Sequence, residues 1–550
     1  MGQTRNKYKG TGGQILVETL ARNGVQRISS VAGESYLPVL DALLDKPEIA
    51  VHTCRQEGGA GFMAEAWGKL TGHPGICFVT RGPGVCNASI AIHTAKQDST
   101  PMIVFMGQVR RWERGREAFQ EVDVRAIFGT LAKWATEIDD PARIPEIVNH
   151  AFSIAQSGRP GPVVIGLPED MLSEMAETEL LPGAVLTKPG IRTGDVDSIL
   201  DAIRSAEKPV MIMGGSGWND HGITEFSSFA RATHIPVAAA FRNHDLIDHK
   251  HGCYVGELGT GPNQVLVERI TQADLIIAFG ARLDEITTQG YTLINGQILI
   301  HIHQDPTEIG KVYQPALGVQ ADLNDMAEVL AGAAFKIDGR NWAGWRDAAR
   351  KDYLDWIKID LSDRPVFNGA DMTAVYYHLR DALPEDAIVT TDAGNFSGWA
   401  QRYLSYGRPG RLLAPISGAM GYSVPSAVAA SIMYPDRMVL GLCGDGGFMM
   451  NGQELATAMH HGAKPIIMLC NNNMYGTIRM HQEKKYPGRI SATSLTNPDF
   501  VKLAESYGAF AARVSHADQF PAALEGARQA GKAALIEVLM DPRQITTKSA

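Results

Sequence analysis

The sequence predicts an α/β protein built from parallel sheets with helices packed on their faces. Three observations lead to this prediction: short apolar runs recur along the whole chain, segments of helical length separate them, and most runs are apolar at consecutive positions. A strand that is buried on both faces carries apolar side chains on both, which is typical of central strands in parallel sheets. The ten runs span residues 76–80, 101–107, 162–167, 209–215, 273–280, 298–302, 387–394, 438–446, 465–472 and 534–540.

The chain length and two irregular stretches predict three such domains. A domain averages about 150 residues, so 550 residues suffice for three or four. Residues 180–194 are rich in Pro and Gly, and residues 338–370 follow the last strand–helix unit of the middle region. Boundaries in these stretches give domains at residues 1–182, 190–345 and 365–550.

Charge, hydrophobicity and cysteine usage exclude several classes of protein. The 51 basic and 60 acidic residues give a net charge of -9 without a dense basic block, so we expect no nucleic-acid partner. The apolar runs are far shorter than the ~20 residues of a membrane helix, so we expect no membrane span. The six cysteines contain no CxxC pair, and the polar start lacks the apolar core of a signal segment. We therefore expect a cytoplasmic protein.

The most informative segment is GLCGDGGFMMNGQELATAMHHGAKPIIMLCNNNMYGTI, residues 441–478. It predicts a strand, a GDGG turn, a helix from about Met449 to His461, and a second strand that ends at Asn472. Two neighbouring parallel strands then deliver Asp445 and Asn472 to the same carboxyl edge, where open α/β sheets bind ligands. His460 and His461 are expected to end the helix, where the macrodipole favours them, and not to form a catalytic pair.

Oxygen ligands at this edge suit a magnesium ion. Asp445 offers a carboxylate, Asn472 an amide oxygen and Met474 a backbone carbonyl, and diphosphate oxygens and water would complete the shell. Gly446 and Gly447 allow backbone N–H groups to approach phosphate. The alternative is a tight strand-to-helix turn with a capping aspartate, and a GDG motif alone would favour that alternative.

The full pattern, with Tyr475 and Gly476 after the paired asparagines, resembles the signature of thiamine-diphosphate-dependent enzymes. The chain resembles their acetolactate synthase and 2-keto-acid decarboxylase group over nearly its whole length. The resemblance implies three doubly wound parallel-sheet domains, of which the first binds the pyrimidine ring of thiamine and the last the diphosphate. Similar segments occur in the family's order at TCRQEGGAGFMAEAWGKLTG (53–72), TRGPGVCN (80–87), AFQEVD (118–123), GRPGPVVIGLPED (158–170), DAGN (392–395) and SGAMGYSVPSA (417–427).

The resemblance assigns catalytic roles to three residues. Glu57 would touch the aminopyrimidine ring and share a proton that helps to remove the proton from thiamine C2; otherwise it is a glutamate at a helix N-terminus. The family usually has His before this glutamate, whereas this chain has Gln56. Gln120 would face the thiazolium ring, or lie in an exposed polar turn. Glu34 would handle protons on the substrate, or cap the helix that follows it.

Cofactor contacts follow from the same resemblance. Met420 would support the bent cofactor, and its alternative is an ordinary core methionine. The complete set of expected cofactor-binding residues is Pro83, Asn87, Gly394, Asn395, Gly418, Met420, Asp445, Gly446, Gly447, Asn472, Tyr475 and Gly476. Residues 214–217, GGSG, follow a strand in the middle region and form a weak nucleotide signal. Members of the family use this domain for FAD, for ADP or for neither, and the choice stays open.

We expect decarboxylation of a 2-keto acid such as pyruvate, with transfer to a second carbonyl compound. The alternatives are a non-ligating decarboxylase, a 2-hydroxyacyl-CoA lyase and a flavin-linked oxidase. In the family, one site combines two subunits, so we expect a homodimer or homotetramer. His481 stands where biosynthetic acetolactate synthases carry a tryptophan, Glu34 adds a carboxylate, and the sequence ends soon after its last expected strand. We therefore expect little preference for 2-ketobutyrate as acceptor.

Overall fold

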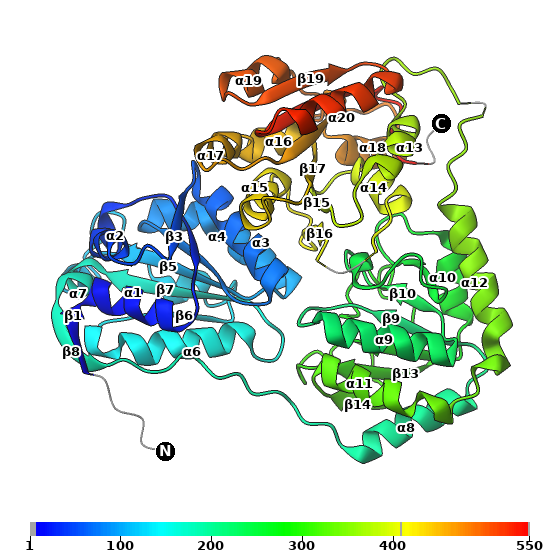
Figure 1. Cartoon of the computed structure of the whole chain (residues 1–550), viewed down its shortest axis with the longest axis horizontal. Coiled ribbons are helices and arrows are strands. Elements are labelled where there is room, and N and C mark those ends of the chain that lie inside the picture. Colours follow the sequence, from blue (N-terminus) through cyan, green and yellow to red (C-terminus); the bar gives the residue numbers. More distant parts are fainter. Residues whose placement is uncertain (1–6, 363, 408–409, 548–550) are drawn as a thin grey trace.

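Three parallel sheets of six strands each form the framework of the protein (Figure 1). The structure is a computed structural model that describes residues 7–362, 364–407 and 410–547. The first residues of the polar start, where we expected no signal segment, lie outside this range. Each sheet is covered by helices, so the prediction of three parallel-sheet α/β domains is confirmed.

The first sheet has the strand order β3-β2-β4-β5-β7-β6. A small antiparallel sheet pairs β1 (Lys7–Thr11) with β8 (Met175–Glu179) beside it. The strands of the first sheet are β2 (Arg27–Ser30), β3 (Ala50–Thr53), β4 (Gly75–Val79), β5 (Met102–Gln108), β6 (Trp134–Glu137) and β7 (Pro162–Pro168). The helices are α1 (Gly12–Arg22), α2 (Leu37–Leu44), α3 (Glu57–Thr71), α4 (Gly82–Asp98), α5 (Val124–Phe128), α6 (Ile144–Gln156) and α7 (Glu169–Ser173).

The central sheet has the strand order β11-β10-β9-β12-β13-β14. Its strands are β9 (Pro209–Met213), β10 (Val237–Ala239), β11 (Tyr254–Glu257), β12 (Leu275–Phe279), β13 (Ile298–His303) and β14 (Leu317–Gln320). Its helices are α8 (Thr193–Ser205), α9 (Asp220–Thr233), α10 (Gln264–Gln272), α11 (Leu323–Ala333) and α12 (Ala343–Trp356). Residues 180–192 lead into this region without a helix or strand, whereas α12 fills much of the second irregular stretch.

The third sheet has the strand order β16-β15-β17-β18-β20-β19. Its strands are β15 (Ile388–Thr391), β16 (Leu412–Leu413), β17 (Val439–Gly444), β18 (Ile466–Asn471), β19 (Phe510–Val514) and β20 (Ala534–Leu539). Its helices are α13 (Met372–Ala382), α14 (Ser397–Tyr403), α15 (Ser423–Met433), α16 (Asp445–Asn451), α17 (Glu454–His460), α18 (Gly476–Lys485), α19 (Phe500–Ser506) and α20 (Phe520–Gln529).

All ten predicted apolar runs overlap a strand of one of the three parallel sheets. Strand β18, for example, is buried along its whole length because it lies between β17 and β20 with helices on both faces. Five of the six cysteines are buried thiols, as their apolar surroundings indicated, and Cys86 is exposed. Among the described residues, no helix is both long and apolar enough to cross a membrane.

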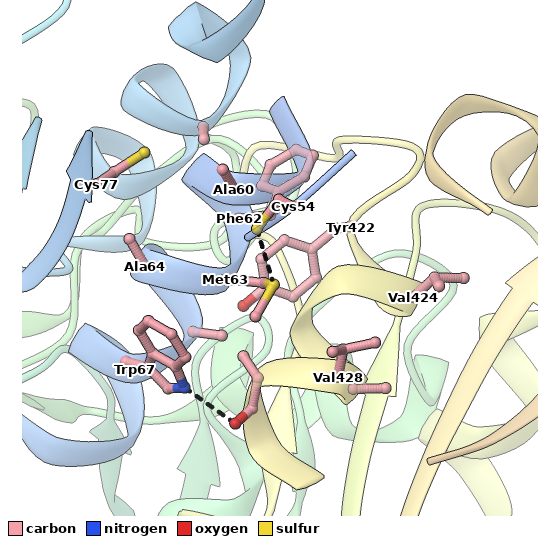
Figure 2. Packing of buried hydrophobic residues seen from close by; sticks show 14 of the residues in the cluster. Cys54, Ala60, Phe62, Met63, Ala64, Trp67, Cys77, Tyr422, Val424 and Val428 are labelled. Atoms are coloured by element: carbon pink, nitrogen blue, oxygen red, sulfur yellow. Dashed lines mark hydrogen bonds between the residues drawn. The ribbon is translucent and has the colours of Figure 1, made fainter. Parts of the chain in front are cut away.

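Helix α3 of the first domain packs against α15 of the third within one hydrophobic core (Figure 2). The Trp67 indole N–H donates a hydrogen bond of 2.9 Å across this interface to the Ala429 carbonyl oxygen. Phe62 meets the ring of Tyr422 edge-on. The two domains that the sequence assigns to one cofactor therefore share a buried interface within the same chain.

Candidate functional site

Strands β17 and β18 deliver polar residues to the carboxyl edge of the third sheet. The strands pair in parallel, with Gly444 opposite Cys470. Asp445 directly follows β17, and Asn472 directly follows β18, so the two residues occupy neighbouring positions at this edge. The structure thus brings together the two residues that the sequence selected as metal ligands.

Asp445 is a buried carboxylate without a basic partner among the residues that the structure describes. Its Oδ2 accepts a hydrogen bond of 2.7 Å from the Asn497 amide, and its Oδ1 accepts one of 3.0 Å from the Gly446 N–H. Burial raises the pKa of Asp445, and these hydrogen bonds oppose the rise. Asn497 also donates to the side-chain oxygens of Asn471 and Asn473. A buried carboxylate among amide oxygens fits a hard cation such as Mg²⁺.

The segment after β18 folds back over this edge. The Asn472 side-chain oxygen accepts a hydrogen bond of 3.2 Å from the Met474 N–H, and the Tyr475 N–H donates to the Thr493 carbonyl oxygen. A Cβ atom at Gly446 would lie 2.5 Å from the Tyr475 ring, so only glycine fits beneath this tyrosine. Gly476 then begins α18, a helix without buried residues.

The helix predicted from Met449 to His461 is wrong in its start and in its continuity. Helix α16 begins at Asp445, four residues earlier. It ends at Asn451, and the separate helix α17 begins at Glu454. The carboxylate in the first turn favours this early start through the helix dipole, although the glycines lower helix propensity. Asp445, Gly446 and Gly447 consequently form a helical turn and not a loop. His460 ends α17 as expected, and His461 is its C-cap.

Asp392 joins two of the expected cofactor segments. Its Oδ1 accepts a hydrogen bond of 2.6 Å from the Ser423 N–H, while Oδ2 is buried without a hydrogen-bond partner among the described residues. A Cβ atom at Gly447 would lie 2.3 Å from Oδ2, so glycine is required there. Burial raises the pKa of Asp392 to about 6. This carboxyl therefore holds the 417–423 segment against the turn that starts at Asp445.

Four further expected contacts belong to the two segments that Asp392 joins. Gly394 has a positive φ, and the Asn395 side-chain oxygen accepts a 3.0 Å hydrogen bond from the Thr477 hydroxyl of α18. Gly418 also has a positive φ and is exposed. Met420 is only partly buried and lies outside the hydrophobic cores, which does not favour its alternative as an ordinary core methionine.

Glu57 is the first residue of α3 at the carboxyl edge of the first sheet. Its Oε2 accepts a hydrogen bond of 2.9 Å from the Asn87 amide. The helix itself is capped by the Gln56 side chain, which accepts from the Gly59 N–H at 3.0 Å. Glu57 therefore does not serve as the cap of this helix. Its side chain faces the GPG turn, where a Cβ atom at Gly84 would lie 3.5 Å from Glu57 Oε1. Pro83 and Asn87 are exposed in the first turns of α4.

Gln120 and Glu34 lie around the same turn. The Gln120 backbone has a positive φ, and its carbonyl oxygen accepts a 3.0 Å hydrogen bond from the Gly82 N–H. Glu34 makes no capping hydrogen bond at the short 3₁₀ helix Glu34–Tyr36. Its exposed carboxylate instead lies 3.2 Å from the guanidinium of Arg81, which also pairs with Glu169 at 2.5 Å. The structure therefore favours a charged role over capping for Glu34.

The expected residues form two groups, one at the carboxyl edge of the first sheet and one at that of the third. No hydrogen bond joins the two groups within the described part of the chain. Sequence reasoning missed Arg81, Asn497 and Asp392 as contributors to these groups. Arg81 lies in the segment 80–87 and Asp392 in the segment 392–395, both of which resemble the family, whereas Asn497 has no motif of its own.

The glycine loop of the central domain lines a cavity of about 900 Å³ where all three domains meet. Gly215 and Gly217 have positive φ values. Arg242 and Lys69 also line the cavity, and the buried Nη1 of Arg242 has no hydrogen-bond partner in the part of the chain that the structure describes. The cavity thus combines a glycine-rich wall with basic and acidic groups, and Lys69 pairs with Asp98 at 2.6 Å.

Comparison with known proteins identifies all three domains. The model described as "Thiamine pyrophosphate enzyme, N-terminal TPP binding domain" matches residues 10–127, the central-domain model residues 196–330, and the C-terminal TPP binding domain model residues 392–538. The acetolactate synthase large subunit of Parasynechococcus marenigrum is 32% identical over 96% of this chain and 87% of its own length. The acetolactate synthase isozyme 2 large subunit of Escherichia coli is 30% identical over 96% of this chain and 95% of its own length. The acetolactate synthase of Bacillus subtilis is also 30% identical, covering 98% and 95%.

Proposed function

Since the chain belongs to the thiamine pyrophosphate enzyme family, we propose that it decarboxylates a pyruvate-like 2-keto acid and ligates the product to a second carbonyl compound. Relatives named acetolactate synthase match nearly the whole chain, which favours ligation over simple decarboxylation, cleavage of a 2-hydroxyacyl-CoA or flavin-linked oxidation. The observation that carries the proposal is that each expected half of the cofactor site lies at the carboxyl edge of its sheet.

Thiamine diphosphate, when bound, supplies the electron sink for loss of CO₂ from a 2-keto acid. Asp445, Asn472 and the Met474 carbonyl would hold Mg²⁺, and the turn at Gly446 and Gly447 would receive the diphosphate. The buried, unpaired carboxylate of Asp445 supports this assignment, because a cation would compensate its desolvation. The assigned cofactor contacts also include Pro83, Asn87, Gly394, Asn395, Gly418, Met420, Tyr475 and Gly476.

Glu57 shares a proton with the pyrimidine ring in this proposal. Asn87 orients the carboxyl group by donating to one oxygen, and the second oxygen remains available to a ligand. Gln120 is assigned to the reacting end of the site, where its backbone fixes the GPG turn. Glu34, held by Arg81, is assigned to proton handling on the substrate.

The residue that bears on the choice of acceptor is His481. His481 is an exposed residue of α18, where an imidazole offers less apolar contact to an ethyl group than an indole. One methylene in an apolar pocket is worth about 1–3 kcal/mol. We therefore assign no strong preference for 2-ketobutyrate over pyruvate as the acceptor.

A homodimer or homotetramer would complete the site, as in the family. Large apolar side chains are exposed near both edges: Trp112 and Phe119 follow β5 in the first domain, and Met449 and Ile478 lie on α16 and α18 in the third. Exposed groups of this size commonly mark a protein interface. A second copy that brings its third domain to the first-domain edge would cover them.

The central cavity is the place for a nucleotide, FAD or ADP, if the protein binds one. Its volume of about 900 Å³ and the glycine loop at residues 214–217 support a phosphate-bearing ligand. Extraction of the purified protein followed by chromatography identifies either nucleotide, and a yellow colour distinguishes FAD from ADP.

The decisive experiment incubates the protein with thiamine diphosphate, Mg²⁺ and a panel of 2-keto acids, and measures both CO₂ and products. We expect one CO₂ for each molecule of a ligated 2-hydroxy ketone product. Release of free aldehyde in equal amount to CO₂ would instead identify a simple decarboxylase. Omitting Mg²⁺ is the control for the metal assignment.

A further inference from the structure

A buried carboxylate of the third domain reaches the loop that precedes Glu57. Glu454, the first residue of α17, accepts hydrogen bonds from the Arg55 N–H at 3.2 Å and from the Gln56 N–H at 3.0 Å through its Oε1. Its Oε2 lies 3.3 Å from the Arg55 N–H and accepts a 2.5 Å bond from the Thr457 hydroxyl. One side chain thus satisfies the two backbone amides directly before Glu57.

The surroundings of Glu454 leave it little freedom. Its side chain is fully buried, and a Cβ atom at Gly59 would lie 2.5 Å from Glu454 Oε1. Burial raises the pKa of Glu454, whereas the Thr457 hydroxyl and the two backbone amides favour its ionised form. The charge and the tight contact therefore hold the Glu454 carboxylate in place as a hydrogen-bond acceptor at the start of α3.

The contact matters because the first amides of a helix have no acceptor within the helix. Gln56 serves as the N-cap of α3 and bonds the Gly59 N–H, but its own N–H and that of Arg55 need an external acceptor. Glu454 provides it from a different domain and also complements the helix dipole. The position of the backbone that carries Glu57 consequently depends on α17.

We propose that Glu454 is a positioning residue for Glu57, a role that rests on the function proposed above. Helix α17 begins shortly after the end of α16, the helix whose first residue is Asp445. The contact therefore links the diphosphate side of the third domain to the proton-sharing carboxylate of the first domain in the same chain. A misplacement of about 1 Å in a reacting group can reduce a rate by about 100-fold, so a small shift of this loop suffices for a measurable effect.

The test compares Glu454→Gln and Glu454→Ala with a control on the same domain interface. Glutamine keeps the shape and one acceptor oxygen but turns the other atom into a donor, and alanine removes both acceptors. The control is Trp67→Phe, which deletes the 2.9 Å hydrogen bond to Ala429 and leaves the Glu57 loop untouched. All three variants weaken the interface, but only the first two alter the support of Glu57.

The first measurement is amide hydrogen–deuterium exchange of a peptide spanning residues 53–60 in the cofactor-free protein. We expect slow exchange at Arg55 and Gln56 in the wild type, and at least tenfold faster exchange in Glu454→Ala. Trp67→Phe should retain the wild-type rates at these two amides. Fast exchange in the wild type, or unchanged exchange in Glu454→Ala, would overturn the proposal.

The second measurement is the rate of hydrogen–deuterium exchange at C2 of bound thiamine, with cofactor and Mg²⁺ at saturation. We expect about a tenfold loss in Glu454→Gln and about a 100-fold loss in Glu454→Ala, with little change in Trp67→Phe. A wild-type rate in both Glu454 variants, or an equal loss of rate in Trp67→Phe, would reject the positioning role. If the wild type bound thiamine diphosphate without accelerating C2 exchange, the proposed function would fail, and the amide measurement would still report on the contact.

Discussion

Because the carboxyl group of Asp392 is buried, we expect the free energy of unfolding of Asp392→Asn to increase relative to that of the wild type as the pH rises. Asp392 is 1% exposed, and no described residue forms a hydrogen bond with its Oδ2. Removal from water raises its pKa from 3.8 to about 6, although the Ser423 N–H and the nearby Arg242 oppose the rise. The folded protein therefore keeps a proton on this group under conditions in which the unfolded chain has released it.

The magnitude follows from the linkage between proton binding and folding. At about 1.4 kcal/mol for each pKa unit, the rise from 3.8 to about 6 corresponds to about 3 kcal/mol. Because the folded state binds more protons between these two values, the Asp392 contribution to the free energy of unfolding falls as the pH rises through this window, and is constant above it. Asparagine does not ionise. Its Nδ2 would be an unsatisfied buried donor, which adds a cost of about 1–3 kcal/mol that does not depend on pH.

Urea unfolding of the cofactor-free protein, followed by circular dichroism, measures the difference. The free energy of unfolding of Asp392→Asn minus that of the wild type should increase by about 2.4 kcal/mol between about pH 4 and pH 7, because part of the full effect lies below pH 4 and the other titrating groups cancel. The control is Asp436→Asn, which makes the same substitution at an exposed position of the third domain. A difference that stays constant or decreases for Asp392→Asn over the same range would refute the reasoning.

Four further predictions test the site itself. Asp445→Ala should lower the Mg²⁺-dependent affinity for thiamine diphosphate at least 100-fold in calorimetric titrations; unchanged affinity would exclude it as a ligand. Glu57→Gln should retain cofactor affinity within about threefold but lose accelerated C2 exchange, and a wild-type exchange rate would exclude the proton-sharing role. Sedimentation should show a dimer or tetramer, and a fully active monomer would contradict the shared site. With pyruvate as donor, competition between 2-ketobutyrate and pyruvate as acceptors should give less than about tenfold preference; a strong preference for 2-ketobutyrate would instead support the biosynthetic specificity.

The strands that could be predicted are those whose burial is visible in the sequence itself. Strand β18 reads as an unbroken apolar run because both of its faces are covered. Strand β2, RISS, was missed although its last three residues are buried. The Ser29 hydroxyl is satisfied by the Ala60 carbonyl oxygen at 2.7 Å, and a tertiary hydrogen bond of this kind leaves no periodic pattern. Strand β3, AVHT, was missed as well. It lies at a sheet edge and carries exposed residues, so it does not form an apolar run.

The two proposed metal-binding residues could be selected because each directly follows a predicted strand. Parallel strands end at the same edge, so the pairing of β17 with β18 was enough to place Asp445 beside Asn472. Asn497 lies 52 positions after Asp445, and Glu454 lies 398 positions after Gln56. These contacts depend on how loops and domains pack, which no local pattern in the sequence encodes.

The domain contacts indicate that the third-domain segments expected to bind the cofactor are not positioned by the third domain alone. Arg242 of the central domain is buried and donates a long hydrogen bond of 3.4 Å to the Asp392 carbonyl oxygen. From the first domain, Glu65 accepts a 2.6 Å hydrogen bond from the Tyr422 hydroxyl, directly before the Ser423 N–H that binds Asp392. Asp392 therefore meets groups whose positions depend on both other domains. A substitution at this junction should alter cofactor affinity without touching the cofactor, and comparison of affinities with C2 exchange rates separates that effect from a loss of proton sharing.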